Sequence, residues 1–249
     1  MVRVVLDRPE IRNAFNDHML SDLLEVFEQI SKEALLRAVV LTGEGKAFCA
    51  GADLNWMRRV VGYTFQENYQ DSLALAQMLG AINECPKPVV CAVNGAAIGG
   101  GTGLVGACDI AVASSDAVFA FTETKLGLTP AVISPYLLKK MGEGNLRRYF
   151  LTGERLSAEQ AKQVGLIQEI APPGELEERV DAIVSSIISG GPQALTVTKE
   201  LIRGICDRGI VENGPYTAEV IARLRSSEEG QEGMNAFLEK RKPRWIMDD

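Results

Sequence analysis

Short runs of Val, Ala and Leu alternate with amphipathic stretches through the first 150 residues of the chain. Four such runs are present: VRVVLDRP (2–9), RAVVLTG (37–43), KPVVCAVNG (87–95) and DIAVASSDAVFAF (109–121). Continuous apolar runs of this length are typical of strands buried on both faces, and the stretches between them suit crossover helices. The first run precedes a helical pattern over 16–31, and the second leads through a glycine turn into another over 55–61. The pattern predicts an α/β fold with an at least partly parallel sheet up to about residue 150.

The last third of the chain is helical by period. The helical stretches are 175–190, 192–207 and 218–243, with SSEEGQEG (226–233) expected as a connection between helices. Before them, Ser157 and Gln160 have the spacing of a capping box, and Gly165 is expected to end that short helix. We therefore divide the chain into an α/β core over 1–190 and a helical C-terminal region over 191–249.

Composition and charge narrow the class of protein. The 249 residues are 46% hydrophobic and 24% charged, and the net charge is −7. Because nucleic-acid binding depends on neutralising phosphates, an acidic chain is not expected to have nucleic acid as its partner. No apolar stretch approaches the ~18–20 residues that span a bilayer. The start, MVRVVLDRPE, has acid and proline where a signal peptide needs its apolar centre. We expect a soluble cytoplasmic protein without a membrane segment.

Cysteine and histidine usage gives no indication of a metal site. The five cysteines show no CxxC spacing, so we expect reduced core thiols rather than a disulfide framework or a zinc site. Cys49 has no neighbouring base that could activate it. The single histidine, His18, lies in the first predicted helix and is expected to be a surface or packing residue.

The segment VNGAAIGGGTGLVGACD (93–109) carries six glycines in seventeen residues and allows three interpretations. First, GTGLVG matches the G-x-G-x-x-G dinucleotide fingerprint, and Glu123 stands twenty residues after Gly103. However, GAAIG separates the motif from its strand, and Glu123 does not end a second strand of the expected kind. Second, Gly99, Gly103 and Gly106 share one helix face, so the helix could pack closely against a sheet.

The third interpretation is an electrostatic site at a helix N-terminus. Free glycine N–H groups at the start of a helix can stabilise developing negative charge, as in an oxyanion hole. A second donor is then expected from another loop, and FCAGADL (48–54) also follows a strand. This interpretation accounts for Gly100 and Gly101, which close packing on one helix face leaves unexplained.

Five motifs resemble the enoyl-CoA hydratase/isomerase (crotonase) superfamily in order and spacing, over nearly the whole chain. They are RPEIRNAFN, GKAFCAGADL, KPVVCAVNGAAIGGGTGL, ACDIAVASSDAVFAF and LTGERLSAEQAKQVGLI. The resemblance implies a β-β-α superhelix with a helical C-terminal region, assembled as a trimer or a dimer of trimers. Family members usually have a further short strand before VRVVLDRP, with which it forms a hairpin.

The resemblance also implies roles for individual residues. The backbone amides of Ala52 and Gly100 would hold the thioester oxygen of an acyl-CoA, and Glu123 would exchange a proton at the α-carbon. A carboxyl group beside an apolar pocket has a raised pKa, which suits that role; the alternative is a surface acid paired with Lys125. The expected substrate contacts are Ala50, Asp53, Leu54, Gly101 and Gly103, with Asp53 equally well explained as a helix cap. Coenzyme A is part of the substrate, and no separate cofactor or metal is implied.

One departure from the family pattern bears on the reaction. Hydratases of the family usually carry a second glutamate two residues after GGG, and this chain has Gly103 there. The chain could thus be a hydratase with one glutamate, a double-bond isomerase, or a non-catalytic acyl-CoA- or RNA-binding relative. Tyr136 or a water could replace the missing acid, although nothing in the sequence singles either out.

Three further details resemble a subgroup assigned to methylglutaconyl-CoA hydration. They are GADLNWM, GGGTGLVGACDIA and GLTPAVISPYL. That substrate has a distal carboxylate, for which Arg58, Arg59 and Lys125 are the candidate partners. The basic tail KRKPR (240–244) resembles family tails that approach the CoA phosphates, although it could equally be a solvated tail.

Overall fold

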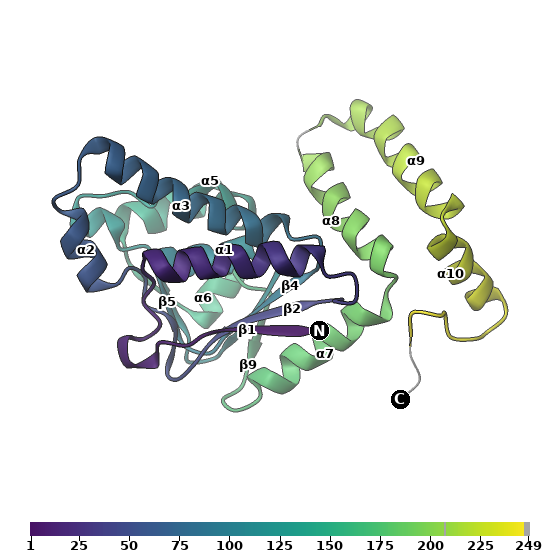
Figure 1. Cartoon of the computed structure of the whole chain (residues 1–249), viewed down its shortest axis with the longest axis horizontal. Helices are drawn as coiled ribbons and strands as arrows, with labels where there is room; N and C mark the ends of the chain where they lie inside the picture. Colours follow the sequence, from purple (N-terminus) through teal and green to yellow (C-terminus); the bar gives the residue numbers. More distant parts are fainter. Residues whose placement is uncertain (207, 247–249) are drawn as a thin grey trace.

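Two β-sheets form the centre of the molecule, and the computed structural model describes residues 1–206 and 208–246 (Figure 1). The first sheet has five parallel strands in the order β1-β2-β4-β6-β9, and the second has four in the order β3-β5-β7-β8, of which only β8 is antiparallel to its neighbour. Their bounds are β1 Val2–Leu6, β2 Val39–Gly43, β3 Ala47–Cys49, β4 Val89–Val93, β5 Ala96–Ile98, β6 Ile110–Ser114, β7 Val118–Ala120, β8 Arg155–Ser157 and β9 Glu169–Ala171.

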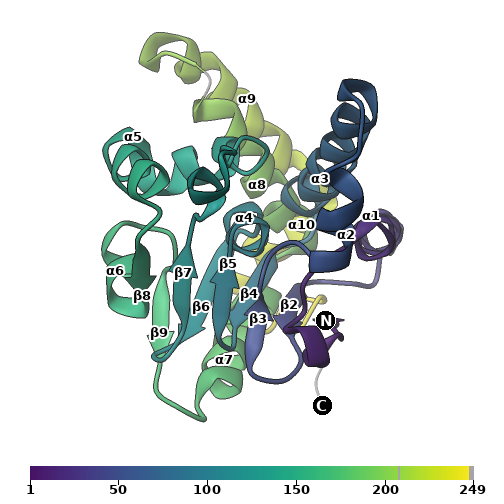
Figure 2. The ribbon, with the colours of Figure 1, turned by 90° about the vertical axis from the view of Figure 1, so that its left-hand side faces the viewer.

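Helices cover these sheets and extend beyond them. Their bounds are α1 Asp17–Lys32, α2 Leu54–Val60, α3 Phe65–Glu84, α4 Gly100–Ala107, α5 Ser134–Thr152, α6 Ala158–Gln163, α7 Leu176–Ser189, α8 Pro192–Cys206, α9 Ile210–Ser226 and α10 Glu228–Leu238, with 3-10 turns η1 Pro9–Ile11 and η2 Glu123–Leu126. Figure 2 shows α4 beside β5, with α7 at the opposite side of the five-stranded sheet. The α/β fold with largely parallel sheets is therefore confirmed.

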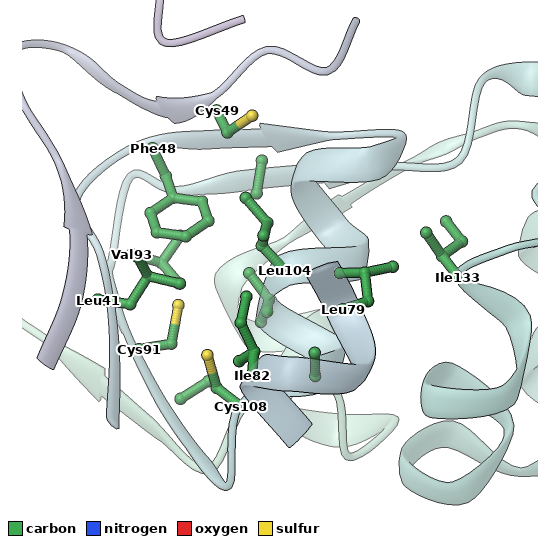
Figure 3. Packing of buried hydrophobic residues seen from close by; sticks show 14 of the residues in the cluster. Leu41, Phe48, Cys49, Leu79, Ile82, Cys91, Val93, Leu104, Cys108 and Ile133 are labelled. Carbon is green, nitrogen blue, oxygen red and sulfur yellow. The ribbon is translucent and has the colours of Figure 1, made fainter. Parts of the chain in front are cut away.

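The alternation of side chains along the buried strands explains this layering. Successive strand residues point to opposite faces, so Val40 and Val90 pack against Val180 of α7, whereas Leu41 faces the main core. In that core Leu41 lies in one cluster with Phe48 of the second sheet (Figure 3). The second sheet is thus packed against the first, and this fixes the position of the loops that leave it.

Several local predictions are confirmed. The helix expected over 16–31 is α1, whose N-cap Asn16 accepts a hydrogen bond from the amide of Met19 at 3.0 Å. Ser157 and Gln160 form the capping box of α6. Gly165 follows that helix with a φ of +84°, in the left-handed region that favours glycine.

Other sequence predictions were wrong because short strands leave no period to read. The run 109–121 is two strands, β6 and β7, which belong to different sheets. The glycine turn after residue 43 contains β3, and β8 and β9 extend the sheets beyond residue 150. The connection between helices expected at SSEEGQEG is present but shorter than that segment, since α9 ends at Ser226 and α10 begins at Glu228.

Helices α8, α9 and α10 project to one side of the sheets (Figure 1). Lys199 of α8 ties them to the core by an ion pair with Asp109 at 2.6 Å and by hydrogen bonds to the carbonyl oxygens of Cys85 and Lys87. The division at residue 190 stays a prediction. The region assigned to 191–249 includes residues 207 and 247–249, which lie outside the described part of the chain.

Candidate active site

Three loops meet at one edge of the four-stranded sheet because three of its strands are parallel neighbours. Cys49 of β3 is paired with Ala97 of β5, and Ala97 is paired with Phe119 of β7. The carboxyl ends of parallel strands lie at the same edge, with neighbouring strands about 4.7–4.9 Å apart. The segments that follow each strand, which hold Ala52, Gly100 and Glu123, therefore lie side by side.

The loop after β3 is held by the segment that precedes α1. The amide of Phe15 donates to the carbonyl of Gly51 at 2.8 Å, and the amide of Asp53 donates to the carbonyl of Phe15 at 2.9 Å. The amide of Ala52 lies between these two bonds and points away from Phe15, as alternate residues of an extended chain do. It has no hydrogen-bond acceptor within the described residues.

Helix α4 begins with a second free amide. Gly99, its N-cap, has a φ of +53° and donates its own N–H to the carbonyl of Ala120 of β7 at 2.8 Å. The N–H of Gly100 opens the helix and has no acceptor in the part of the chain that the structure describes. Since the first amides of a helix carry its positive dipole end, this amide can stabilise a negative oxygen.

Steric contact accounts for the lack of side chains at this helix start. A Cβ atom at Gly100 would overlap the ring of Phe15, and one at Gly101 would overlap the carbonyl oxygen of Cys49. The helix therefore lies directly on β3 and on Phe15. The contact residues expected at Gly101 and Gly103 have their Cα faces against protein, and their role as substrate contacts stays a prediction.

Glu123 lies immediately beside the helix start, in the turn that follows β7. A Cβ atom at Gly99 would lie 3.1 Å from Oε1 of Glu123. The other oxygen, Oε2, is buried without a hydrogen-bond partner, and burial raises the pKa of this carboxyl group. Within the described residues, no ion pair joins Glu123 to Lys125. The side chain of Lys125 lies instead beside Gly153. A half-buried carboxyl group with a spare oxygen can take up and release a proton.

The place of the second family glutamate is filled by another residue. Gly103 is buried, and a Cβ atom there would overlap Cγ2 of Ile133, itself 2% exposed. One turn later, a Cβ at Gly106 would lie 3.0 Å from the side chain of Leu137. Close packing on the glycine face of α4 is thus confirmed, but the partner is α5 and the residue preceding it rather than a sheet.

The dinucleotide interpretation of GTGLVG does not fit this structure. Its glycines at 101, 103 and 106 lie inside α4 instead of forming the turn that leaves a strand. Their Cα faces are covered by Cys49, Ile133 and Leu137. No backbone surface of the motif is left to approach a pyrophosphate, as that fingerprint requires.

Asp53 has a structural role in the same loop. Its Oδ1 accepts from the amide of Asn55 at 2.7 Å as the N-cap of α2, and its Oδ2 accepts from Arg8 at 3.0 Å. Burial raises the pKa of Asp53, but the bonds from Asn55 and Arg8 outweigh it and hold the pKa below its usual value. Of its two predicted neighbours, Ala50 is partly buried and Leu54 is 70% exposed.

Two of the three basic residues proposed for a distal carboxylate, Arg58 and Arg59, have other partners here. Arg59 forms an ion pair with Asp17 at 2.7 Å, and Arg58 donates to the side chain of Asn55 at 2.8 Å. In the tail, Arg241 is paired with Glu232, as is Arg244 more loosely, at 3.5 Å.

The remaining candidates lie outside this edge or cannot react there. The hydroxyl of Tyr136 lies near Gly80 of α3, and its Cβ lies near Gly106 of α4, so nothing places the hydroxyl beside Glu123. His18 is exposed on α1. Burial raises the pKa of the Cys49 thiol to about 12, which keeps it protonated at neutral pH.

Sequence reasoning missed the contribution of the segment RPEIRNAFN. Asn13 is fully buried, and its side chain donates to the carbonyls of Glu44 and Ala47 at 2.8 Å each. Arg12 and Asn13 both have positive φ, a turn that aims Phe15 at the site. The only signal in the sequence was a Phe, Phe15, close to Asn13 in an otherwise polar turn. Their partners are more than 30 residues away along the chain, so these contacts could not be predicted.

Two loop amides without acceptors and a half-buried carboxyl group lie at one sheet edge, an arrangement that can stabilise an oxyanion and move a proton. The comparisons with known proteins give the family. The profile of the family described as "Enoyl-CoA hydratase/isomerase" matches residues 1–247, and this chain belongs to that family.

Three relatives illustrate the similarity. The crystal structure of an enoyl-CoA hydratase from Shewanella pealeana has a TM-score of 0.95 and 41% identity, covering 98% of this chain and 92% of that one. A Thermus thermophilus protein that carries the provisional name enoyl-CoA hydratase is 39% identical, over 97% of this chain and 96% of its own length. The short-chain-enoyl-CoA hydratase of Clostridium acetobutylicum is 33% identical, over 96% of this chain and 91% of its own. The crotonase fold and the enzyme class follow from these matches.

The described residues contain neither a candidate membrane helix nor a candidate metal site. No helix in that part of the chain is long and apolar enough to cross a membrane. No group of three or more His, Cys, Asp or Glu side chains among those residues could hold a metal ion.

Proposed function

We propose that this protein adds water across the double bond of an α,β-unsaturated acyl-CoA, with 3-methylglutaconyl-CoA as the substrate. The observation that carries the proposal is the position of Glu123 beside the start of α4, with Ile133 packed where a second carboxylate would stand. The names of the relatives support hydration, and the three sequence details of the methylglutaconyl subgroup support the acyl group.

The residues divide the reaction between them as follows. The amides of Ala52 and Gly100 donate to the thioester oxygen and so stabilise the enolate that forms there. Glu123, ionised, takes a proton from water as the water oxygen bonds to the β-carbon and the electron pair moves to the thioester oxygen. The protonated Glu123 then returns the proton to the α-carbon as the thioester carbonyl re-forms. One carboxyl group with a raised pKa serves both steps, because it holds the proton between them.

Coenzyme A enters this reaction as part of the substrate, and we propose no separate cofactor or metal. Ala50, Asp53 and Leu54 would line its path, and the exposed side chain of Leu54 supports a contact there. We further propose a trimer or dimer of trimers working in the cytoplasm. Exposed apolar side chains in the C-terminal helices, Ile210, Val211 and Phe237, support burial against another subunit.

Absorbance at the enoyl-thioester band tests the proposal. The purified protein is offered 3-methylglutaconyl-CoA and crotonyl-CoA in turn. We expect the band to be lost with the branched acid and to change much more slowly with crotonyl-CoA. A gain of conjugation from a 3-enoyl-CoA, with no loss from either enoyl ester, would instead establish a double-bond isomerase. Binding of the esters without any spectral change would indicate a non-catalytic acyl-CoA-binding relative.

A further inference from the structure

A cavity of about 280 Å³ lies at the end of α4 opposite to Gly100. Its wall includes Gly106 and Cys108, six or more residues along the chain from Gly100, which is ~9 Å at 1.5 Å per helical residue. The fully buried side chain of Leu137 packs between α4 and α5 on the same face. The cavity is therefore separate from the candidate active site.

Four cationic side chains from two helices line this cavity, although the chain is acidic as a whole. Lys139 and Lys140 come from α5, and Lys199 and Arg203 come from α8, some 60 residues later. Asp109 is the acid in the lining, and it is already paired with Lys199.

The four cations differ in how many of their hydrogen-bond donors are already used within the protein. Lys199 uses its donors on Asp109 and on two carbonyl oxygens, at 2.6 to 3.1 Å, so its role is structural. Arg203 has one long bond, 3.4 Å, to the carbonyl of Asn83, and Lys140 has one of 3.3 Å to the carbonyl of Val105.

Lys139 has no hydrogen-bond or ion-pair partner within the described residues. Three cations of the lining thus keep unused donors. Burial lowers the pKa of Lys140, because the charged form of a buried amine is less favourable than in water. Burial, and after it the negative charge of Glu84, raise the pKa of the Tyr136 hydroxyl. This one acid leaves the balance of unpaired charge around the cavity positive.

Apart from the side-chain amide of Asn83, which donates to the carbonyl of Ala107 at 3.1 Å, the rest of the lining is apolar. Ile202, Pro135 and the ring of Tyr136 form it together with Gly106 and Cys108. Pockets for organic ligands combine an apolar wall with a few convergent polar groups, and this volume suits a ligand of a few carbon atoms. An inorganic anion would use the cations but leave the apolar wall uncovered.

We propose that this cavity binds a short-chain carboxylate, with its carboxylate group against Lys139, Lys140 and Arg203 and its hydrocarbon on Ile202, Pro135 and Tyr136. The carboxylate supplies the acceptors that the three cations lack, and the hydrocarbon covers the apolar wall. This assignment is independent of the reaction proposed above, since it uses none of the residues at the sheet edge.

Calorimetric titration of the full chain with hexanoate tests this assignment. We expect saturable binding that weakens about tenfold in Arg203→Gln and in Lys139→Gln, since each removes a charge-assisted hydrogen bond. Ile202→Glu places an acid at a half-exposed position on the same wall and is expected to abolish binding without unfolding the chain. The matched control is Arg147→Gln. Arg147 is exposed on α5, the helix of Lys139, and is paired with Glu143, so this variant should bind hexanoate as the wild type does.

Two further probes separate the parts of the proposal. Inorganic phosphate and hexanol each supply half of the ligand, so both should bind more weakly than hexanoate. Glu123→Gln alters only the sheet edge and should leave hexanoate binding unchanged. Three results would each overturn the proposal: absence of saturable binding, hexanoate affinity in folded Arg203→Gln and Lys139→Gln equal to that of the wild type, or phosphate binding as tight as hexanoate binding.

Discussion

The ring of Phe15 lies directly against Gly100, while the main chain of Phe15 bonds on both sides of Ala52. One residue thus contacts both backbone segments that supply the proposed oxyanion donors. The ring also packs edge-on against Trp56 of α2, with 5.6 Å between centroids. The separation of the two amides is therefore set by packing on Phe15, and it can be altered from either side.

Gly100→Ala should be damaging because its Cβ would overlap the Phe15 ring. We expect the helix start to shift, with a loss of about 1–3 kcal/mol of stability from overpacking and a fall in kcat of about 10²–10³-fold as one donor is misplaced. Adding Phe15→Leu, which vacates the ring position, should restore part of both. Steady-state kinetics and thermal unfolding measure this. Gly144→Ala, where a Cβ has open space within α5, is the control: it should leave kcat unchanged and should not lower stability.

Glu123→Gln should abolish turnover and keep the fold. General acid–base groups contribute about 10²–10⁴-fold, so we expect a loss of that size in kcat with little change in CoA-ester affinity. The melting temperature should not fall, because the amide removes a buried charge that lacks a partner for Oε2. Rate and equilibrium binding are measured on the same preparation, with Glu154→Gln, a partly exposed acid paired with Arg148, as control. Retained turnover would show that another group moves the proton.

The pH dependence of kcat/KM should reflect the environment of Glu123. Burial raises the pKa of its carboxyl group above 4.5, and the proposed first step needs the ionised form. The acid limb should therefore have its midpoint above the ordinary glutamate value.

The free energy of unfolding should rise as the pH falls through the pKa of Glu123, whereas kcat/KM should fall. A carboxyl group whose folded pKa is raised costs stability when ionised, and this cost is relieved as the pH falls through the folded pKa. Glu123→Gln should remove that part of the pH dependence of unfolding. In the kinetic experiment, an acid limb of kcat/KM with its midpoint at or below pH 4.5 would contradict the assignment of Glu123 as the acid–base group.

Gly103→Glu should not create a second catalytic acid. Its side chain would overlap Ile133, which is almost fully buried, so we expect a destabilised protein with reduced activity. Gly103→Glu combined with Ile133→Ala opens that space and should recover stability relative to Gly103→Glu alone. Ile133→Ala by itself gives the reference for the cavity. Equal stability of Gly103→Glu and wild type would show that Ile133 can move aside.

The thiols should divide sharply in a labelling experiment. Cys49, Cys85, Cys91 and Cys108 are buried, while Cys206 is exposed. We expect one fast-reacting thiol in the native protein and five after unfolding, measured with a chromogenic disulfide reagent. Cys206→Ser should remove the fast phase and leave activity unchanged. Fast reaction of a second thiol would mean that the core opens more readily than its burial implies.

The sequence predicted those parts of the site that depend on local pattern. The glycines at 99–101, the helix start near Asn16 and the capping box at Ser157 are short-range signals, and their positions agree with the structure. Strands of three residues such as β3 and β7 carry too few positions to show an alternation, so their membership of a second sheet was not predictable. The packing of Ile133 on Gly103 joins segments 30 residues apart and follows only from the fold.

The two proposed oxygen-binding donors belong to the main chain, and this has a consequence for how the protein can change over time. No substitution at Ala52 or Gly100, other than proline, deletes an N–H group; it can only displace it. Substitutions at Ala52 and Gly100 are therefore limited by steric fit to neighbours such as Phe15. Substitutions at Glu123 are limited instead by the loss of its carboxyl group. New acyl specificities can arise by altering the surrounding walls while the oxygen-binding frame is inherited intact.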